Sequence, residues 1–352
     1  MLMLSSRWHG NARDGVVGMS MFDDGGMRRA SWRWLFLTLV ALTSLLVSSC
    51  NKQGDSVVMA GDGSRLSSEE IDKDPLALLP QGVVGLIHID AQSAFQSQLG
   101  ASTRKLIQAA MPLGPEANFD PSRDIKRVVI GLYSLQGADA AMIIQGTFDP
   151  DAIRSAASLG RPNALGVQLT RLEYANNDLF VAGGVGFVVV TRNTMIAGNE
   201  TGIRRTLDRI RDKRIRREVP DWMAKLIDDP KASVVGVADL STDPMVAGAA
   251  QQTPFLNGLT VVRVLGNFEP PGINFAGSLT YPDPDTATRA GASLDQLGQL
   301  TSYARLLSLI GIQPPIQNLQ VRVEQRDVQF IAAVNAQGAA QVMEWGAGSL
   351  GR

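Results

Sequence analysis

The chain has 352 residues, of which 45% are hydrophobic, and its 33 basic and 34 acidic side chains give a formal net charge of −1. A chain of this length can bury an ample core, and its balanced charge argues against a nucleic-acid partner. The single cysteine excludes an intramolecular disulfide, so the core must hold the fold.

The first feature along the chain is an uncharged apolar run, Trp34–Val47, preceded by three arginines between residues 28 and 33. A basic segment, a short apolar segment and small residues before a cleavage site are typical of a secretory signal. A transmembrane helix needs roughly 20 apolar residues, so this run is too short to span a membrane. Residues 1–49 are therefore predicted to be a signal peptide.

The run ends in Val-Ser-Ser-Cys at residues 47–50, which resembles the lipobox of bacterial lipoproteins. That resemblance implies a diacylglyceryl group on Cys50, removal of residues 1–49 and acylation of the new amino terminus. These acyl groups are the only cofactor expected, and the alternative is an ordinary signal peptide cleaved elsewhere. Asn51, where aspartate would resemble an inner-membrane retention signal, favours the outer membrane within the cell envelope.

The segment that follows is predicted to be a flexible tether over residues 50–74. It is rich in Gly, Ser and Asp, and Val57–Met59 is its only apolar stretch. Such a segment buries too little apolar area to offset the entropy lost on ordering. Order is expected to begin near Pro75. The first 49 residues hold five arginines and three aspartates, which leaves 28 basic and 31 acidic residues in the mature chain.

The body contains an internal repeat. Two segments end a strand in Thr-aromatic and continue through Asp-Pro-Asp into an alanine-rich run. The matched segments are 147–159 with 280–294, 83–90 with 234–241, and 167–184 with 319–334. Because they keep the same order, the sequence predicts a duplication with copies at 75–219 and 220–352.

Each copy is predicted to follow the order β–α–β–β–α–β–β with a closing helix. Strands are expected where β-branched residues cluster, at 126–133, 187–192 and 259–268. Helices set apart from runs of paired strands favour an antiparallel α+β layer over a doubly wound parallel sheet. The closing helices are expected from Asn199, which would cap its helix, and over 336–345.

His88 is the one histidine of the predicted mature chain. A Ser-His-Asp or Cys-His arrangement would have to use it. However, alternation places it on the strand face of Leu86, and the second copy has Asp239 at the matching position. No recognisable nucleophile motif accompanies it. His88 is therefore interpreted as a polar residue where a strand leaves the core.

The two Asp-Pro-Asp segments allow a metal site or helix caps. Spaced carboxylates suit hard cations. The capping interpretation explains each residue, with the first aspartate as cap, proline at the first helical position and the second aspartate beside the positive end of the helix dipole. The sequence therefore favours caps and no metal. The residues are Asp149, Pro150 and Asp151 in the first copy, and Asp283, Pro284 and Asp285 in the second.

A cluster of positive charge lies within residues 204–218. Membrane-proximal basic helices bind anionic lipid or lipopolysaccharide phosphates, but a solvated helix face with ion pairs explains the same pattern. The possible contacts to an anionic surface are Arg204, Arg205, Arg209, Arg211, Lys213, Arg214, Arg216 and Arg217.

A wider resemblance covers most of residues 75–340. ALLPQGVVGLIHID, FDPSRDIKRVVIGL and the GTFDPD helix resemble uncharacterised envelope lipoproteins of myxobacteria and their relatives. The expected function is a lipid-anchored, non-catalytic envelope lipoprotein that binds a protein, peptidoglycan or lipid partner. The alternative is a carboxylate-dependent hydrolase or carbohydrate-active enzyme using Asp90, Asp239 or the Asp-Pro-Asp carboxylates. The scarcity of histidine and aromatic residues favours the first hypothesis.

Overall fold

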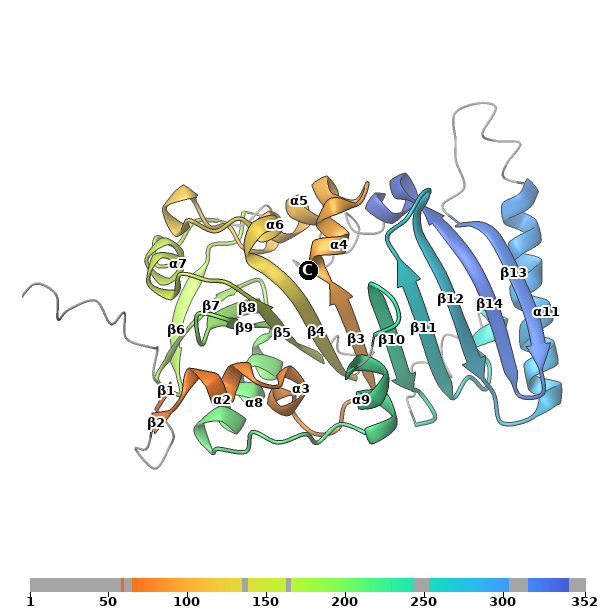
Figure 1. Ribbon diagram of the computed structural model, residues 1–352, viewed down its shortest axis with the longest axis horizontal. Helices are drawn as coiled ribbons and strands as arrows, with labels where there is room; N and C mark the ends of the chain where they lie inside the picture. Colours follow the sequence, from red (N-terminus) through yellow and green to blue (C-terminus); the bar gives the residue numbers. More distant parts are fainter. Residues whose placement is uncertain are drawn as a thin grey trace, which may run out of the picture. The chain divides into compact units, whose positions relative to one another are not determined.

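The computed structural model describes residues 58–59, 65–134, 139–162, 166–228, 230–242, 253–303 and 316–341. The chain divides into two units, residues 1–54 and 55–352, and every described residue belongs to the second. The predicted signal peptide and Cys50 lie outside the described residues. Within the second unit, helices accompany one large antiparallel sheet, so the predicted α+β class is confirmed (Figure 1).

The first part of this unit contains most of the helices. Its elements are β1 (Val58–Met59), β2 (Arg65–Leu66), α2 (Ser68–Asp72), α3 (Pro75–Leu78), β3 (Gly85–Asp90), α4 (Ala91–Gln96), α5 (Gly100–Ala110), η1 (Pro115–Ala117), α6 (Pro121–Asp124), β4 (Ile125–Ser134), β5 (Asp139–Gly146), α7 (Pro150–Ala157), β6 (Thr170–Tyr174), β7 (Asn177–Ala182), β8 (Val185–Val189), β9 (Thr194–Asn199), α8 (Glu200–Arg211) and α9 (Asp221–Asp228).

The second part is dominated by strands. Its elements are β10 (Val234–Asp239), η2 (Pro254–Leu256), β11 (Val261–Asn267), β12 (Gly272–Thr280), α11 (Pro284–Tyr303), β13 (Ile316–Glu324) and β14 (Asp327–Asn335), followed by helical residues 336–341. The predicted strands at 126–133, 187–192 and 259–268 overlap β4, β8 and β11, where β-branched residues pack well on a pleated surface.

The described residues form a 12-stranded sheet in the order β13-β14-β12-β11-β10-β3-β4-β5-β9-β8-β7-β6. Every neighbouring pair in it is antiparallel. In the middle, β3 pairs with β10, and Val235 lies opposite His88. The sheet therefore continues across the predicted boundary at residues 219 and 220.

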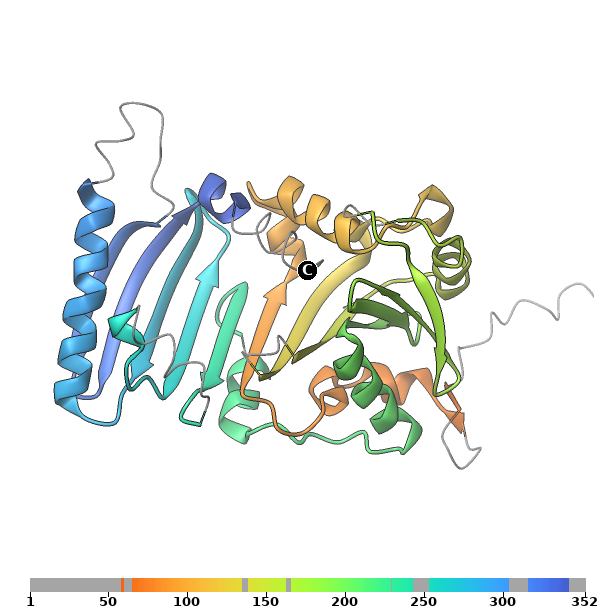
Figure 2. The same cartoon turned by 180° about the vertical axis from the view of Figure 1, so that it is seen from behind.

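The first half of the sheet is covered on both faces. On β5, Ile143 belongs to a core with residues of α2, α3, α8 and α9, whereas its neighbour Ile144 belongs to a core with residues of α4, α5 and α7. Figures 1 and 2 show these two groups of helices beside the first half of the sheet. Successive residues of a strand point to opposite faces, so neighbouring apolar residues build two separate cores. The first core also includes Val235 and Val237 of β10.

The second half has a helical cover on one face of its described residues. Leu279 of β12 and Val328 of β14 pair across the sheet and are buried with Ala287 and Ala290 of α11. The opposite face carries exposed side chains such as Gln329 and Ile331.

The predicted helix caps are confirmed. Asp149 accepts a hydrogen bond from the Ala152 amide at 3.1 Å, and Asp283 accepts one from Thr286 at 2.8 Å. Pro150 and Pro284 are the first residues of α7 and α11. Asn199 caps α8 as predicted, through the Gly202 amide at 3.1 Å.

One further cap, at Asn335, was not predicted from the sequence. Asn335, at the end of β14, accepts a hydrogen bond from the Gly338 amide at 2.6 Å, as Asn199 does from Gly202. The signal was present in the sequence as Asn-x-x-Gly at both positions.

Two expectations were wrong. Order begins before Pro75, because α2 has a capping box between Ser67 and Glu70, and its Ile71 is fully buried. The first half also has four strands after α7 where two were predicted. The β8–β9 hairpin lies beside β5 as β13–β14 lies beside β12. The predicted match of 167–184 with 319–334 therefore joins strands that hold different places in the sheet.

Candidate functional site

A polar groove of about 470 Å³ lies where the two halves of the sheet meet. It is formed by the end of β3, the start of β4, the segment before β10 and the end of β11. The lining residues are His88, Asp90, Lys126, Arg127, Pro230, Lys231, Ala232, Ser233 and Asn267.

His88 lies in this groove and is more deeply buried than the sequence analysis expected, with 5% of its surface exposed. Its Nδ1 accepts a hydrogen bond from Arg127 Nε at 3.1 Å. Burial, and then the charge of Arg127, lower the pKa of His88 to about 4, while Asp90 opposes the shift. His88 is therefore neutral at neutral pH, and because Nδ1 accepts, its proton is on Nε2.

Arg127 is half-buried beside His88. Its Nη2 donates to the carbonyl of Ile227 in α9 at 3.3 Å. Among the described residues, no carboxylate lies within 4.0 Å of its guanidinium. Burial is the main cause that lowers the pKa of Arg127, while the more distant charges of Asp228 and Asp74 raise it and so compensate its charge in part. A desolvated guanidinium without an ion-pair partner is costly unless another group or ligand compensates its charge.

Asp90, the carboxylate of the groove, is already used as the cap of α4. Its Oδ1 accepts from the amides of Gln92 and Ser93 at 3.1 and 3.3 Å, and its Oδ2 accepts from the Ser93 hydroxyl at 2.5 Å. These bonds hold the carboxylate to its own helix, so it does not neutralise Arg127.

Three further side chains of the groove keep unused donors in the described structure. Ser233 donates its backbone amide to Asn267 Oδ1 at 3.0 Å, which leaves the serine hydroxyl and the asparagine Nδ2 without a partner. Lys126 is exposed and makes no hydrogen bond or ion pair within the described residues. The groove is consequently rich in donors and poor in available acceptors.

The carboxylates proposed for catalysis are not brought together. His88 and Asp239 share a sheet face, but antiparallel pairing sets His88 opposite Val235, and Asp239 lies at the other end of β10. Asp239 accepts from the amide and the hydroxyl of Ser241 at 3.1 and 2.7 Å. In the described ranges, no three His, Cys, Asp or Glu side chains gather as metal ligands.

The basic segment is largely neutralised by carboxylates. Arg209 is 2% exposed, and it pairs with Glu218 and donates to the carbonyl of Arg216 at 2.6 Å. The other pairs are Arg204 with Glu200, Arg205 with Asp139, Arg211 with Asp208 and Asp212, Arg214 with Asp212, Arg216 with Glu218, and Arg217 with Asp74 and Asp228. This arrangement favours the interpretation as a paired surface over an anionic-lipid contact.

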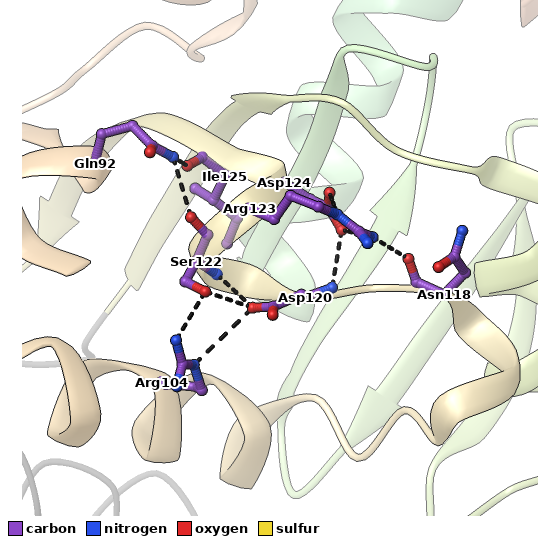
Figure 3. A network of polar contacts seen from close by, with 8 residues as sticks. All are labelled: Gln92, Arg104, Asn118, Asp120, Ser122, Arg123, Asp124 and Ile125. Atoms are coloured by element: carbon purple, nitrogen blue, oxygen red, sulfur yellow. Dashed lines mark hydrogen bonds and ion pairs between the residues drawn. The ribbon is translucent and has the colours of Figure 1, made fainter. Parts of the chain in front are cut away.

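A second polar cluster was not singled out from the sequence, although its signal, Asp-Pro-Ser-Arg-Asp at 120–124, was visible (Figure 3). Asp120 caps α6 through the amide and hydroxyl of Ser122 at 2.9 and 2.7 Å. Asp124 accepts from the Asp120 amide at 2.8 Å and pairs with Arg123 at 2.6 Å. Both carboxylates thus fix the turn before β4.

Gln92 connects this turn to the groove. Its Nε2 donates to the carbonyl of Ile125 at 2.6 Å and to that of Ser122 at 3.3 Å (Figure 3). Since Gln92 follows the Asp90 cap, the start of α4 and the start of β4 are held together.

No helix in the described part of the chain is long and apolar enough to cross a membrane. No protein-family model and no curated protein matches the chain. Among solved structures, the chain is similar to crystal forms I, III and IV of a protein called TP0453, at 10, 11 and 12% identity and TM-scores of 0.48, 0.45 and 0.44. Each match covers 77% of this chain and 96 to 97% of the other. Similarity at this level carries no functional conclusion.

Proposed function

We propose that the chain is a lipid-anchored protein of the bacterial cell envelope with a non-catalytic binding role. The observation that carries the non-catalytic part is the environment of His88. A general base must accept a proton at an accessible nitrogen near the working pH. Here Arg127 occupies Nδ1, and the pKa of His88 is lowered to about 4.

The candidate carboxylates support the same proposal against the hydrolase alternative. A pair of catalytic carboxylates has to flank one reacting bond. Asp90, Asp149 and Asp283 instead accept hydrogen bonds from the first turns of α4, α7 and α11.

The anchor is proposed at Cys50, on the lipobox-like residues 47–50. One acyl chain binds a membrane only marginally, whereas two or more hold it stably. The partner of the anchored body would be an envelope protein, peptidoglycan or lipid.

We further propose that the body arose by duplication of one α+β unit, as in the envelope lipoproteins that it resembles. Two features support this proposal. The Asp-Pro caps start α7 and α11, and the Asn-x-x-Gly caps follow β9 and β14. Counted outward from the centre of the sheet, the strand orders are β3-β4-β5-β9-β8 and β10-β11-β12-β14-β13. In both, three strands that are consecutive in the chain are followed by a hairpin whose second strand lies nearer the centre.

The anchor is tested by labelling cells with radioactive palmitate. Replacing Cys50 with serine should abolish the label and leave an unprocessed precursor, because the thiol is the acceptor. The matched variant Asn51→Asp keeps the thiol, so it should remain labelled and move toward the inner membrane on fractionation. Continued labelling of Cys50→Ser would refute the anchor.

A further inference from the structure

We propose that the groove around Arg127 binds a phosphate-bearing ligand. This inference deepens the non-catalytic binding role proposed above and rests on it. The chemistry of the ligand is inferred from the residues that line the groove. They include two cations, Arg127 and Lys126, and three neutral hydrogen-bond donors, His88, Ser233 and Asn267.

Of the three described cationic side chains that line the groove, Arg127 and Lys126 have donors available to a ligand. The guanidinium of Arg127 donates to His88 and to the carbonyl of Ile227, and its Nη1 group has no hydrogen-bond acceptor in the described structure. Lys126 precedes it on the same strand and is exposed. Arginine and lysine are the side chains that proteins use for phosphate, because charge-assisted hydrogen bonds are the strong ones.

Three neutral hydrogen-bond donors also line the groove. The Nε2 proton of His88, the hydroxyl of Ser233 and the Nδ2 group of Asn267 all belong to groove residues and have no partner in the described ranges. Since the pKa of His88 is lowered to about 4, this histidine is a donor at Nε2 without carrying a charge.

The one carboxylate among the described residues that line the groove is already occupied. Asp90 accepts three hydrogen bonds from its own helix, so the groove does not present a free carboxylate to a cationic ligand. Five donor side chains exceed what the two oxygens of a carboxylate ligand can bind at once, whereas a phosphate offers three terminal oxygens. The volume of about 470 Å³ leaves room for an organic group beyond the phosphate.

The test uses the full chain in a non-ionic detergent and titrates inorganic phosphate by calorimetry. Saturable binding is expected. Lys126→Gln should weaken it about tenfold, since one charge-assisted bond is lost, and Ser233→Ala should weaken it about threefold. Lys126 has no partner to lose, so the fold should be unaffected.

The matched control is Arg322→Gln, which removes an exposed positive charge from β13, at the edge of the sheet. It should leave the phosphate affinity unchanged within about twofold, because exposed charges are screened over about 8 Å at physiological ionic strength. An equal loss in Arg322→Gln would overturn the assignment to the groove.

Two further experiments distinguish a soluble phosphate ligand from a lipid headgroup. Glycerol 3-phosphate and vesicles containing phosphatidic acid are compared, each with Lys126→Gln and Arg322→Gln. Competition by glycerol 3-phosphate identifies a soluble ligand. For the vesicle experiment the chain carries Cys50→Ser, because the acyl anchor would otherwise bind every vesicle. Sedimentation that Lys126→Gln then weakens more than Arg322→Gln identifies a lipid headgroup.

Two outcomes would refute the inference. One is no saturable binding up to about 20 mM phosphate, and the other is equal affinity for acetate, which would contradict the preference for phosphate. Either result leaves the Cys50 anchor and the non-catalytic role intact. Turnover of a phosphate ester that Lys126→Gln slows would instead confirm phosphate binding and refute the non-catalytic role.

Discussion

The two halves of the sheet share the order of their five central-most strands, to which the first half adds β7 and β6, but they differ in how they are covered. In the first half, helices lie on both faces, and β9 has five successive buried residues from Thr194 to Gly198. In the second half, α11 covers one face of the described strands, and β13 alternates between half-buried and exposed residues over much of its length. A strand that is buried on both faces has a continuous run of buried residues, whereas a strand with one solvent-exposed face alternates between buried and exposed residues.

This difference indicates which part of the molecule contributes most of the buried apolar core. The first half contributes two clusters of buried apolar side chains, and the larger one includes residues of β10. The second half is therefore partly stabilised by the core of the first. The groove lies at this junction, between β3 and β10, where the covered and open parts of the sheet meet.

The largest expected effect distinguishes the covered half from the open one. Ile143→Ala in β5, where the side chain is fully buried, should lower the free energy of unfolding by about 2–5 kcal/mol. Ile331→Ala in β14, which is 56% exposed, should lower it by less than about 1 kcal/mol. Urea unfolding followed by circular dichroism measures both. Equal losses would refute the contrast between the halves.

The next effect tests whether residues 65–74 belong to the fold. Asp72 of α2 accepts from the hydroxyls of Thr191 and Thr194 at 2.5 and 2.7 Å, and from Asn193 Nδ2 at 2.9 Å. Asp72→Ala leaves these donors unpaired, and a loss of about 2–3 kcal/mol in unfolding free energy is expected.

Its control is Glu69→Ala on the same helix. Glu69 is exposed, so the change should stay within about 0.5 kcal/mol. If Asp72→Ala is as mild as this control, α2 does not contribute to stability and the tether extends to Pro75.

A smaller effect depends on pH at the junction of the halves. The pKa of His88 is lowered from 6.5 to about 4, so the unfolded chain binds more protons between these values and stability rises with pH across that window. Above pH 6.5 this contribution is complete, and it is lost as the pH falls to 4. His88→Asn should remove the dependence, which reaches about 1.4 kcal/mol per pH unit at its steepest.

Unfolding curves of the original chain and His88→Asn, recorded from pH 7 to 4, give this contribution as their difference. A constant difference over that range would show that His88 titrates at its ordinary pKa, and would remove the main support for the non-catalytic role.

The smallest effect compares equivalent caps in the two halves. Asp149→Ala and Asp283→Ala should each lower the free energy of unfolding by about 1 kcal/mol, because one hydrogen-bond acceptor is lost at the start of each helix. Asp151→Ala is the control, with a side chain 91% exposed and an expected change of a few tenths of a kcal/mol. Very different losses at Asp149 and Asp283 would argue against equivalent roles in the two halves.

The sequence by itself determined the features that depend on neighbouring residues. The caps at Asp149, Asp283 and Asn199 could be predicted because a cap contacts amides two or three residues further along the chain. Strand positions followed from β-branched clusters, and the α+β class followed from their spacing. The structured start of the body was not predicted, because the polar composition of residues 50–74 is typical of a disordered segment, although Ser67 and Glu70 form a capping box that marks the start of a helix.

The tertiary structure alone decided which distant residues meet. His88 and Arg127 are 39 positions apart, and Ser233 and Asn267 come from the other half of the sheet. Only the pairing of β3 with β4 and β10 brings these residues to one groove. The burial that lowers the pKa of His88 likewise depends on packing, because desolvation is set by the whole surroundings of a group and not by its neighbours in sequence.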